Sequence, residues 1–197
     1  MSVDPGPRER MVRSALELIG TQGVSGTGMR EVVGHAGAPR GSLQHYFPQG
    51  KEQLVREALA LAGRTAVGSV ERVREGGTSF RPSDVLEVMV AAWRRWLTDS
   101  DYALGCPAVA SMADVGAAAP ALRAAVEDVF AVWQGAIEGA LRDAGLPPAR
   151  AGVWASVLLS ALEGAIVLSR ARRSLAPLEA VRAELAPVVD AQAAAAG

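Results

Sequence analysis

The chain has 197 residues, of which 50% are hydrophobic and 21% charged, so it can bury a core and is not a disordered chain. Its net charge of -1 excludes a positive field over the whole molecule, so any surface that binds nucleic acid must be local. The single cysteine excludes an internal disulfide framework and argues against a zinc site built from cysteines.

Proline and glycine divide the chain into segments that carry helical periodicity, and no strand pattern of period two occurs. We therefore predict an all-α fold of about nine helices. The first helix is expected over residues 8–22, where Gly23 ends it, and the second over residues 28–36, where Thr27 caps it. The third is expected over residues 40–47 and the fourth over residues 51–75.

Beyond the break at residues 75–82, Ser83 or Asp84 is expected to cap the next helix. Further helices are expected over residues 109–114, 120–144 and 149–173, with a last one from Pro177. The most hydrophobic run contains Glu163 and falls short of the ~20 apolar residues that a membrane span needs. We interpret it as a buried helix and expect no membrane association; the N-terminus shows no apolar signal segment, and a reducing cytoplasm fits the cysteine count.

The stretch GAPRGSLQHYFPQGKEQL, residues 37–54, carries the features of a helix-turn-helix. Gly37 permits the tight turn, while Leu43 and Phe47 lie four residues apart and are expected to face inward. No acidic residue occurs between Val32 and Lys51, so this segment does not repel a phosphate backbone. The positions expected to face outward, and to donate to base edges and phosphates, are Arg40, Ser42, Gln44, His45 and Tyr46.

The segment TGMREVVGHAGAPRGSLQHYFPQGKEQLVREAL, residues 27–59, resembles the DNA-binding segment of the TetR family of transcriptional regulators. The longer FPQGK spacing, GCPAVA at 105–110 and LEGAIVLSRARRSLAPLEAV at 162–181 resemble the LmrA/YxaF-like subgroup. The resemblance implies that Thr27, Tyr46 and Lys51 hold phosphates, and that Arg40, Gln44 and His45 face the major groove. At position 44 the family often has an aromatic residue, so the base read by Gln44 stays open.

The resemblance also implies that the C-terminal helices enclose an effector pocket and that the last two long helices pair with those of a second copy. We place the junction inside the fourth helix, with a DNA-binding domain over residues 1–54 and a ligand-binding and dimerisation domain over residues 55–197. A cavity for a large apolar or aromatic ligand is predicted from side chains that core packing explains equally well: Met89, Trp93, Trp96, Met112, Phe130 and Trp133.

We therefore predict a DNA-binding regulator, acting as a repressor, that binds a palindromic operator in double-stranded DNA as a homodimer and is released by a small-molecule effector. An enzyme is not expected, because both histidines lie within the first fifty residues and no phosphate-binding glycine loop or metal-ligand cluster occurs. No cofactor and no metal are expected. A helical adaptor for other proteins is the alternative, although an adaptor has no need of Arg40 and Lys51.

Overall fold

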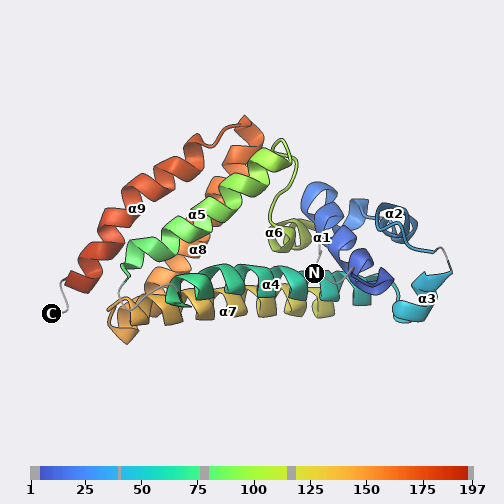
Figure 1. Ribbon diagram of the computed structural model, residues 1–197, viewed down its shortest axis with the longest axis horizontal. Helices are drawn as coiled ribbons and strands as arrows, with labels where there is room; N and C mark the ends of the chain where they lie inside the picture. Colours follow the sequence, from blue (N-terminus) through green and yellow to red (C-terminus); the bar gives the residue numbers. More distant parts are fainter. Residues whose placement is uncertain (1–4, 40, 76–79, 115–118, 195–197) are drawn as a thin grey trace. The chain divides into compact units, whose positions relative to one another are not determined.

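The computed structural model describes residues 5–39, 41–75, 80–114 and 119–194, and the fold is all-α as predicted (Figure 1). Within these ranges there are nine helices and no strand. Their bounds are α1 Pro7–Gly26, α2 Met29–His35, α3 Ser42–Tyr46, α4 Lys51–Glu75, α5 Pro82–Asp99, α6 Pro107–Asp114, α7 Pro120–Asp143, α8 Pro148–Arg172 and α9 Ala176–Ala194.

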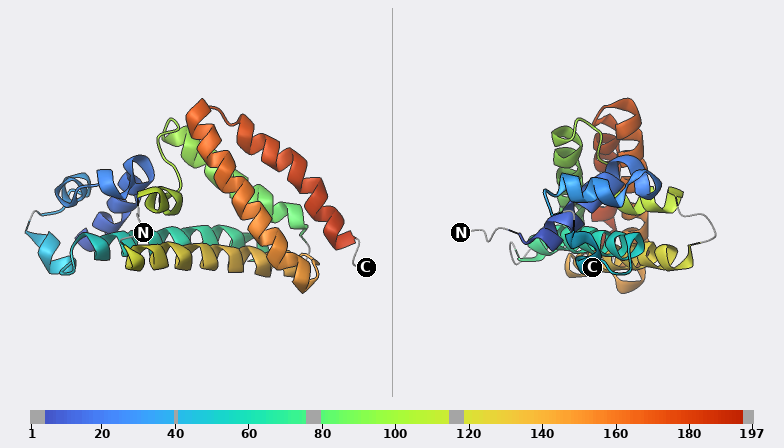
Figure 2. Two further views of the ribbon diagram at one scale, coloured as in Figure 1. Left: turned by 180° about the vertical axis from the view of Figure 1, so that it is seen from behind. Right: turned by 90° about the vertical axis from the view of Figure 1, so that its right-hand side faces the viewer.

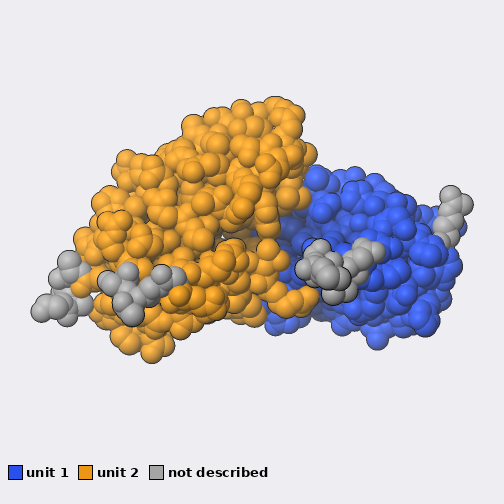
Figure 3. Space-filling model, viewed as in Figure 1, with its two compact units in different colours: residues 1–63, 106–129 blue, residues 64–105, 130–197 orange. Residues whose placement is uncertain are grey.

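The chain packs into two compact units, which Figure 3 shows in separate colours. Unit 1 contains residues 1–63 and 106–129, and unit 2 contains residues 64–105 and 130–197. Both α4 and α7 therefore contribute to each unit. The predicted domain division into residues 1–54 and 55–197 stays a prediction, because these units group segments by packing alone.

In unit 1, α1 packs against α2 and α6. The buried face of α1 repeats at helical spacing through Met11, Val12, Ala15 and Ile19. Gly23 interrupts the helical geometry with φ 77° and ψ 174°, so the stop predicted there is a kink, and the helix assignment continues to Gly26.

The connection between α2 and α3 begins at Gly37, whose φ of 57° is in the left-handed region that the predicted tight turn requires. The backbone N–H of Ala38 donates to the Val33 carbonyl at 3.1 Å and closes the end of α2. After α3, Phe47 is 1% exposed and anchors the end of that helix in the core, as predicted. Gly50, with φ 73°, then turns the chain into α4.

The predicted helix cap at Thr27 is wrong, and of the two residues predicted to cap α5 only Asp84 takes part, by accepting a hydrogen bond from the Arg81 N–H at 2.7 Å. Gly28, and not Thr27, is the residue that precedes α2, and its N–H donates to Glu31 Oε2 at 3.2 Å. Ser83 does not precede α5, since that helix begins at Pro82; the N–H and hydroxyl of Ser83 donate instead to the Asp190 carboxylate of α9 at 2.8 and 2.9 Å.

In unit 2, α5, α8 and α9 pack against one another, and Figure 2 shows them side by side. Their core is formed by Leu86, Val90, Leu97, Leu158, Leu162, Ile166 and Leu178. By length and composition, α8 is the one helix among the described residues that could span a membrane. One side of it is buried inside the unit, as the sequence predicts, while Val153, Val157, Val167 and Leu168 remain exposed.

Candidate nucleic-acid interface

The recognition helix α3 presents two side chains to solvent. Gln44 and His45 are exposed, whereas Leu43 is half-buried and Phe47 is buried. This separation follows from the helix itself: Leu43 and Phe47 are one turn apart on one face, and the residues between them face elsewhere. The amide of Gln44 and the imidazole of His45 can each donate to and accept from a base edge.

Tyr46 is half-buried and lies beside His45, with ring centroids 4.9 Å apart in an edge-to-face arrangement. Ser42 is half-buried, and its hydroxyl donates to the Pro39 carbonyl at 2.6 Å. The Ser42 oxygen can still accept a hydrogen bond, but its proton is already engaged. Arg40, the remaining residue predicted for this helix, lies outside the described residues.

Lys51 is the first residue of α4 and is half-buried. Thr27 is 3% exposed, and its hydroxyl donates to the Gly23 carbonyl at 2.7 Å. This hydroxyl can donate to a phosphate only if its bond to Gly23 breaks. Otherwise a phosphate contact at this point has to come from another group at the start of α2. The phosphate-binding roles of Thr27 and Lys51 stay predictions.

The acid-free segment begins after Glu31, which lies in the first turn of α2. Hydrogen bonds from the Gln22 amide and from the Gly28 backbone N–H lower the pKa of Glu31 below its usual value. The carboxylate therefore accepts hydrogen bonds from the end of α1 and the start of α2, and it remains ionised near neutral pH. Its charge stabilises the positive end of that helix.

Sequence reasoning missed the contacts that hold α1 to the end of α2 and to α6. Arg10 Nε donates to the Ala36 carbonyl at the end of α2 at 3.1 Å, and its second donor reaches the Pro5 carbonyl at 2.7 Å. Asp114, at the end of α6, accepts a hydrogen bond from the Ser25 N–H at 2.9 Å. These partners are 26 and 89 residues apart in the chain, so no local spacing signals them.

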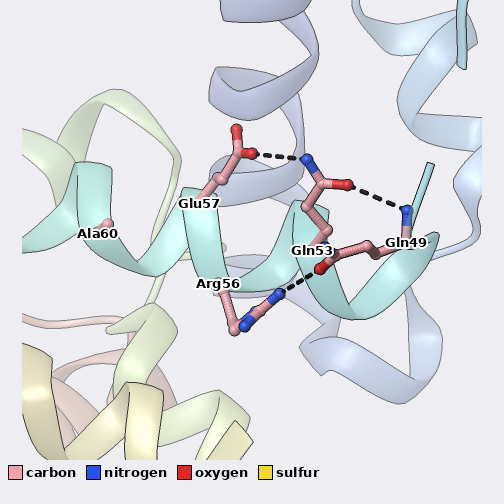
Figure 4. A pocket seen from close by; sticks show the side chains of 5 residues that line it. All are labelled: Gln49, Gln53, Arg56, Glu57 and Ala60. Carbon is pink, nitrogen blue, oxygen red and sulfur yellow. Dashed lines mark hydrogen bonds between the residues drawn. The ribbon is translucent and has the colours of Figure 1, made fainter. Parts of the chain in front are cut away.

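A groove of about 360 Å³ lies beside the start of α4. Figure 4 shows the side chains around it, which join the α3–α4 turn to the first turns of α4 by hydrogen bonds. The groove is lined by Gln49, Gln53, Arg56, Glu57 and Ala60. No motif in the sequence pointed to these residues, because exposed glutamine and glutamate are ordinary on a helix surface.

The side chains predicted to contact a ligand form two aromatic pairs in unit 2. The rings of Trp93 and Trp96 are 5.1 Å apart, and those of Phe130 and Trp133 are 5.7 Å apart, both edge to face. Met89 is buried, whereas Met112 lies in unit 1 and is 41% exposed. The indole N–H of Trp133 is buried without a hydrogen-bond partner among the described residues. Their role in ligand binding stays a prediction.

In the part of the chain that the structure describes, no group of three His, Cys, Asp or Glu side chains is placed to hold a metal ion. What unit 1 does contain is a short helix with exposed polar side chains, anchored by its aromatic end and preceded by a glycine turn. This arrangement defines a helix-turn-helix of the kind that enters the major groove of DNA.

Two family models match the chain and agree with this geometry. Residues 12–58 match the bacterial regulatory proteins of the tetR family, and residues 82–184 match the C-terminal domain of LmrA/YxaF-like transcriptional regulators. The chain belongs to the TetR family of DNA-binding transcriptional regulators and carries the LmrA/YxaF-like C-terminal domain.

Similar proteins support the assignment along the whole chain. An HTH-type transcriptional regulator of Mycobacterium tuberculosis is 38% identical over 186 residues, which cover 91% of this chain and 92% of that protein. The HTH-type transcriptional regulator LmrA of Bacillus subtilis is 28% identical over 87% of this chain and 90% of its own length. A TetR transcriptional regulator of Legionella pneumophila has the same fold, with a TM-score of 0.79 at 16% identity over 98% of this chain and 100% of its own.

Members of this family are soluble DNA-binding proteins and are generally not enzymes, so the apolar composition of α8 does not indicate a membrane protein.

Proposed function

We propose that this protein is a cytoplasmic repressor that binds a palindromic operator as a homodimer and is released by a small apolar or aromatic effector. The observation that carries this proposal is an apolar row on the surface of α8. The row consists of Val153, Val157, Val167 and Leu168, whose side chains are 52%, 40%, 49% and 47% exposed. Ser160 and Gly164, both exposed, complete it.

Five of these positions, from Val153 to Val167, follow one another at intervals of four and three residues, and Leu168 lies four residues after Gly164, so all six share one face of the helix. An exposed face of this kind is costly in water and marks an interface between proteins. A second copy of the same chain, related by a two-fold axis, can cover this face, because the row of one copy then packs against the same row of the other.

A two-fold dimer presents two copies of α3 to successive major grooves on one side of the duplex, about 34–36 Å apart or a multiple of it. In this proposal Gln44 and His45 of each copy read base edges together with Arg40. Ser42, Tyr46, Lys51 and the start of α2 at Thr27 contact the backbone. A palindromic operator follows from the symmetry of the dimer.

For the effector, the two aromatic pairs in unit 2 supply rings against which an apolar ligand can pack, with Met89 of the same unit as an adaptable neighbour. The unpartnered indole N–H of Trp133 is a donor for a ligand oxygen. Release from DNA then requires that the ligand stabilise a conformation in which the two recognition helices no longer match the operator spacing. The contact of Asp114 with Ser25 supports a role for α6 in moving α1.

The test uses duplex DNA enriched by the protein from a random-sequence library. Affinity for the enriched site should fall steeply as salt rises, because binding to phosphates releases counterions. Arg40→Ala should lose about 1–3 kcal/mol of preference for that site over random DNA, as expected for a contact to a base edge. Lys51→Ala is the matched control, because it removes a cation that is proposed to contact phosphate. It should weaken binding to both DNAs equally and reduce the slope of log affinity against log salt concentration by about one.

Measurement of Kd by fluorescence anisotropy between low and high salt separates these outcomes. Binding that does not depend on salt, or no enrichment of any sequence, would contradict the proposal. Equal behaviour of the two variants would contradict the division between base-reading and backbone-holding residues.

A further inference from the structure

Gln53, in the first turns of α4, uses both ends of its amide inside the protein. Its Oε1 accepts the backbone N–H of Gln49 at 3.1 Å (Figure 4). Its Nε2 donates to Glu57 Oε1 at 3.0 Å and to the carbonyl of Tyr46, the last residue of α3, at 3.4 Å. One half-buried side chain therefore binds the end of the recognition helix and the turn that follows it.

Glu57 continues this connection to α1. Its Oε1 also accepts a hydrogen bond from Arg8 at 2.7 Å, and the guanidinium carbon of Arg8 lies 5.7 Å from the centre of the Phe47 ring. On the other side of the groove, Arg56 donates to the side-chain oxygen of Gln49 at 2.8 Å. Side chains of α1, the α3–α4 turn and α4 are thus linked in series from Arg8 to the end of α3.

The helix held in this way is short. It has five residues, so few of its carbonyls are bonded within the helix, and its direction depends on contacts outside it. The hydrogen bonds from Gln53 fix its C-terminal end and the turn at Gln49. A small rotation at that end moves Gln44 and His45 relative to the bases, and hydrogen bonds to base edges tolerate little misalignment.

We propose that Gln53 and Glu57 are positioning residues that set the orientation of α3, and so the base selectivity of the protein, without contacting DNA themselves. This inference rests on the proposed reading of an operator by α3. It differs from the DNA contacts proposed above, because Gln53 and Glu57 would affect selectivity through hydrogen bonds that they make within the protein. Both protons and the oxygen of the Gln53 amide are already engaged, so the side chain has no free donor for a phosphate.

The experiment compares the ratio of affinities for the library-enriched site and for random DNA. Gln53→Ala removes three hydrogen bonds and is expected to lower this ratio about fivefold or more, the equivalent of one net hydrogen bond. Affinity for random DNA and its salt slope should stay unchanged, since no phosphate contact is lost. Base preferences measured by repeating the enrichment with the variant should broaden at the positions that α3 contacts.

Gln53→Glu and Glu57→Gln form a matched pair. Alone, Gln53→Glu places two carboxylates one turn apart and lowers the ratio. In the double variant, the new amide at position 57 donates to the new carboxylate at position 53 and part of the ratio should return. Glu52→Gln is the control, because it removes the same charge from the first turn of α4 at an exposed position that has none of these contacts.

A merely structural role predicts that Gln53→Ala lowers the thermal midpoint and leaves the ratio unchanged, and that result would overturn the inference. A direct DNA contact predicts equal loss on both DNAs with a smaller salt slope, which would overturn it as well. If the wild-type protein enriches no site, operator reading fails and this inference fails with it. Enrichment by the wild type with an unchanged ratio in the variants overturns this inference alone.

Discussion

Gly23 combines φ 77° with ψ 174°, a backbone conformation that is essentially restricted to glycine. A Cβ at this position would lie 2.3 Å from Oδ2 of Asp114, the atom that accepts the Ser25 N–H. Two separate effects therefore act on any side chain at position 23: backbone strain and displacement of the Asp114 carboxylate. The kink places Ser25 where that carboxylate can reach its N–H, so one residue shapes the contact between α1 and α6.

We predict that Gly23→Ala lowers the free energy of unfolding by about 1–3 kcal/mol, the usual cost of such a conformation for a residue with a Cβ. Urea denaturation followed by circular dichroism measures this change. Gly135→Ala is the matched control, because Gly135 lies within α7 with open space where its Cβ would be. That variant should be neutral or more stable by about 0.5–1 kcal/mol. If Gly23→Ala has the same free energy of unfolding as the wild type, the fold does not require the kink at Gly23.

At the scale of elements, helix bounds could be predicted well where prolines and glycines delimit an apolar stripe. The prediction for α4 over residues 51–75 is confirmed, and α7 and α8 end within one residue of the prediction. The third helix is shorter than predicted, since it spans Ser42–Tyr46 and Gly41 precedes it. The exposed side chains Gln44 and His45 were also predictable, since they follow from the period of one short helix.

Contacts between elements could not be predicted in the same way. The bonds Arg10 to Ala36, Arg8 to Glu57 and Ser83 to Asp190 join residues 26, 49 and 107 positions apart. They depend on how helices pack, and no periodicity within one helix encodes that. The capping error at Ser83 has the same origin, since its hydroxyl donates to Asp190 of α9, whereas the Thr27 hydroxyl donates locally to the Gly23 carbonyl four residues earlier.

The contact between α5 and α9 contains an ion network that makes stability depend on pH. Glu179 of α9 accepts hydrogen bonds from Arg94 of α5 and, at 3.0 Å, from Arg182, which also donates to Glu87 of α5 at 2.9 Å. The hydrogen bond from Arg94, and then that from Arg182, lower the pKa of Glu179 below its usual value. A lowered pKa stabilises the fold above the unfolded-state pKa, and this contribution is lost as the pH falls through the folded-state pKa.

We predict that Glu179→Gln lowers the free energy of unfolding at pH 7 by about 1 kcal/mol or less, since these side chains are partly exposed and water screens the ion pairs. Because wild-type Glu179 loses its charge on acidification, the difference between variant and wild type should shrink once the pH falls below the ordinary pKa of a glutamate and disappear below the lowered folded-state pKa of Glu179. Urea denaturation at a series of pH values measures both effects. Glu184→Gln, at an exposed position of the same helix, is the control and should leave stability at pH 7 unchanged. A constant difference at all pH values would contradict the role of ionised Glu179.

At the scale of the whole molecule, α8 has two sets of apolar residues: one that the fold of a single chain buries and one that only a second protein could bury. Trp154, Leu158, Leu162 and Ile166 of this helix are buried within the unit, so they are required for the fold of one chain. Val153, Val157, Val167 and Leu168 are not buried by the chain itself. When one apolar side of a helix is exposed, its burial against a partner protein is favourable.

We predict that Val157→Glu prevents formation of the proposed dimer, because the charge would have to be buried without a partner within the apolar row. Sedimentation velocity should show the mass of one chain, with the circular dichroism spectrum unchanged, since Val157 is 40% exposed and is not part of the buried core. Loss of dimerisation should also remove preference for a palindrome over a single half-site, while weak binding to random DNA persists. Val132→Glu is the matched control: this valine of α7 is 51% exposed but lies outside the row, so the variant should remain a dimer. If Val157→Glu stays dimeric while Val132→Glu dissociates, the interface lies on another face, and the operator symmetry inferred from α8 has no structural basis.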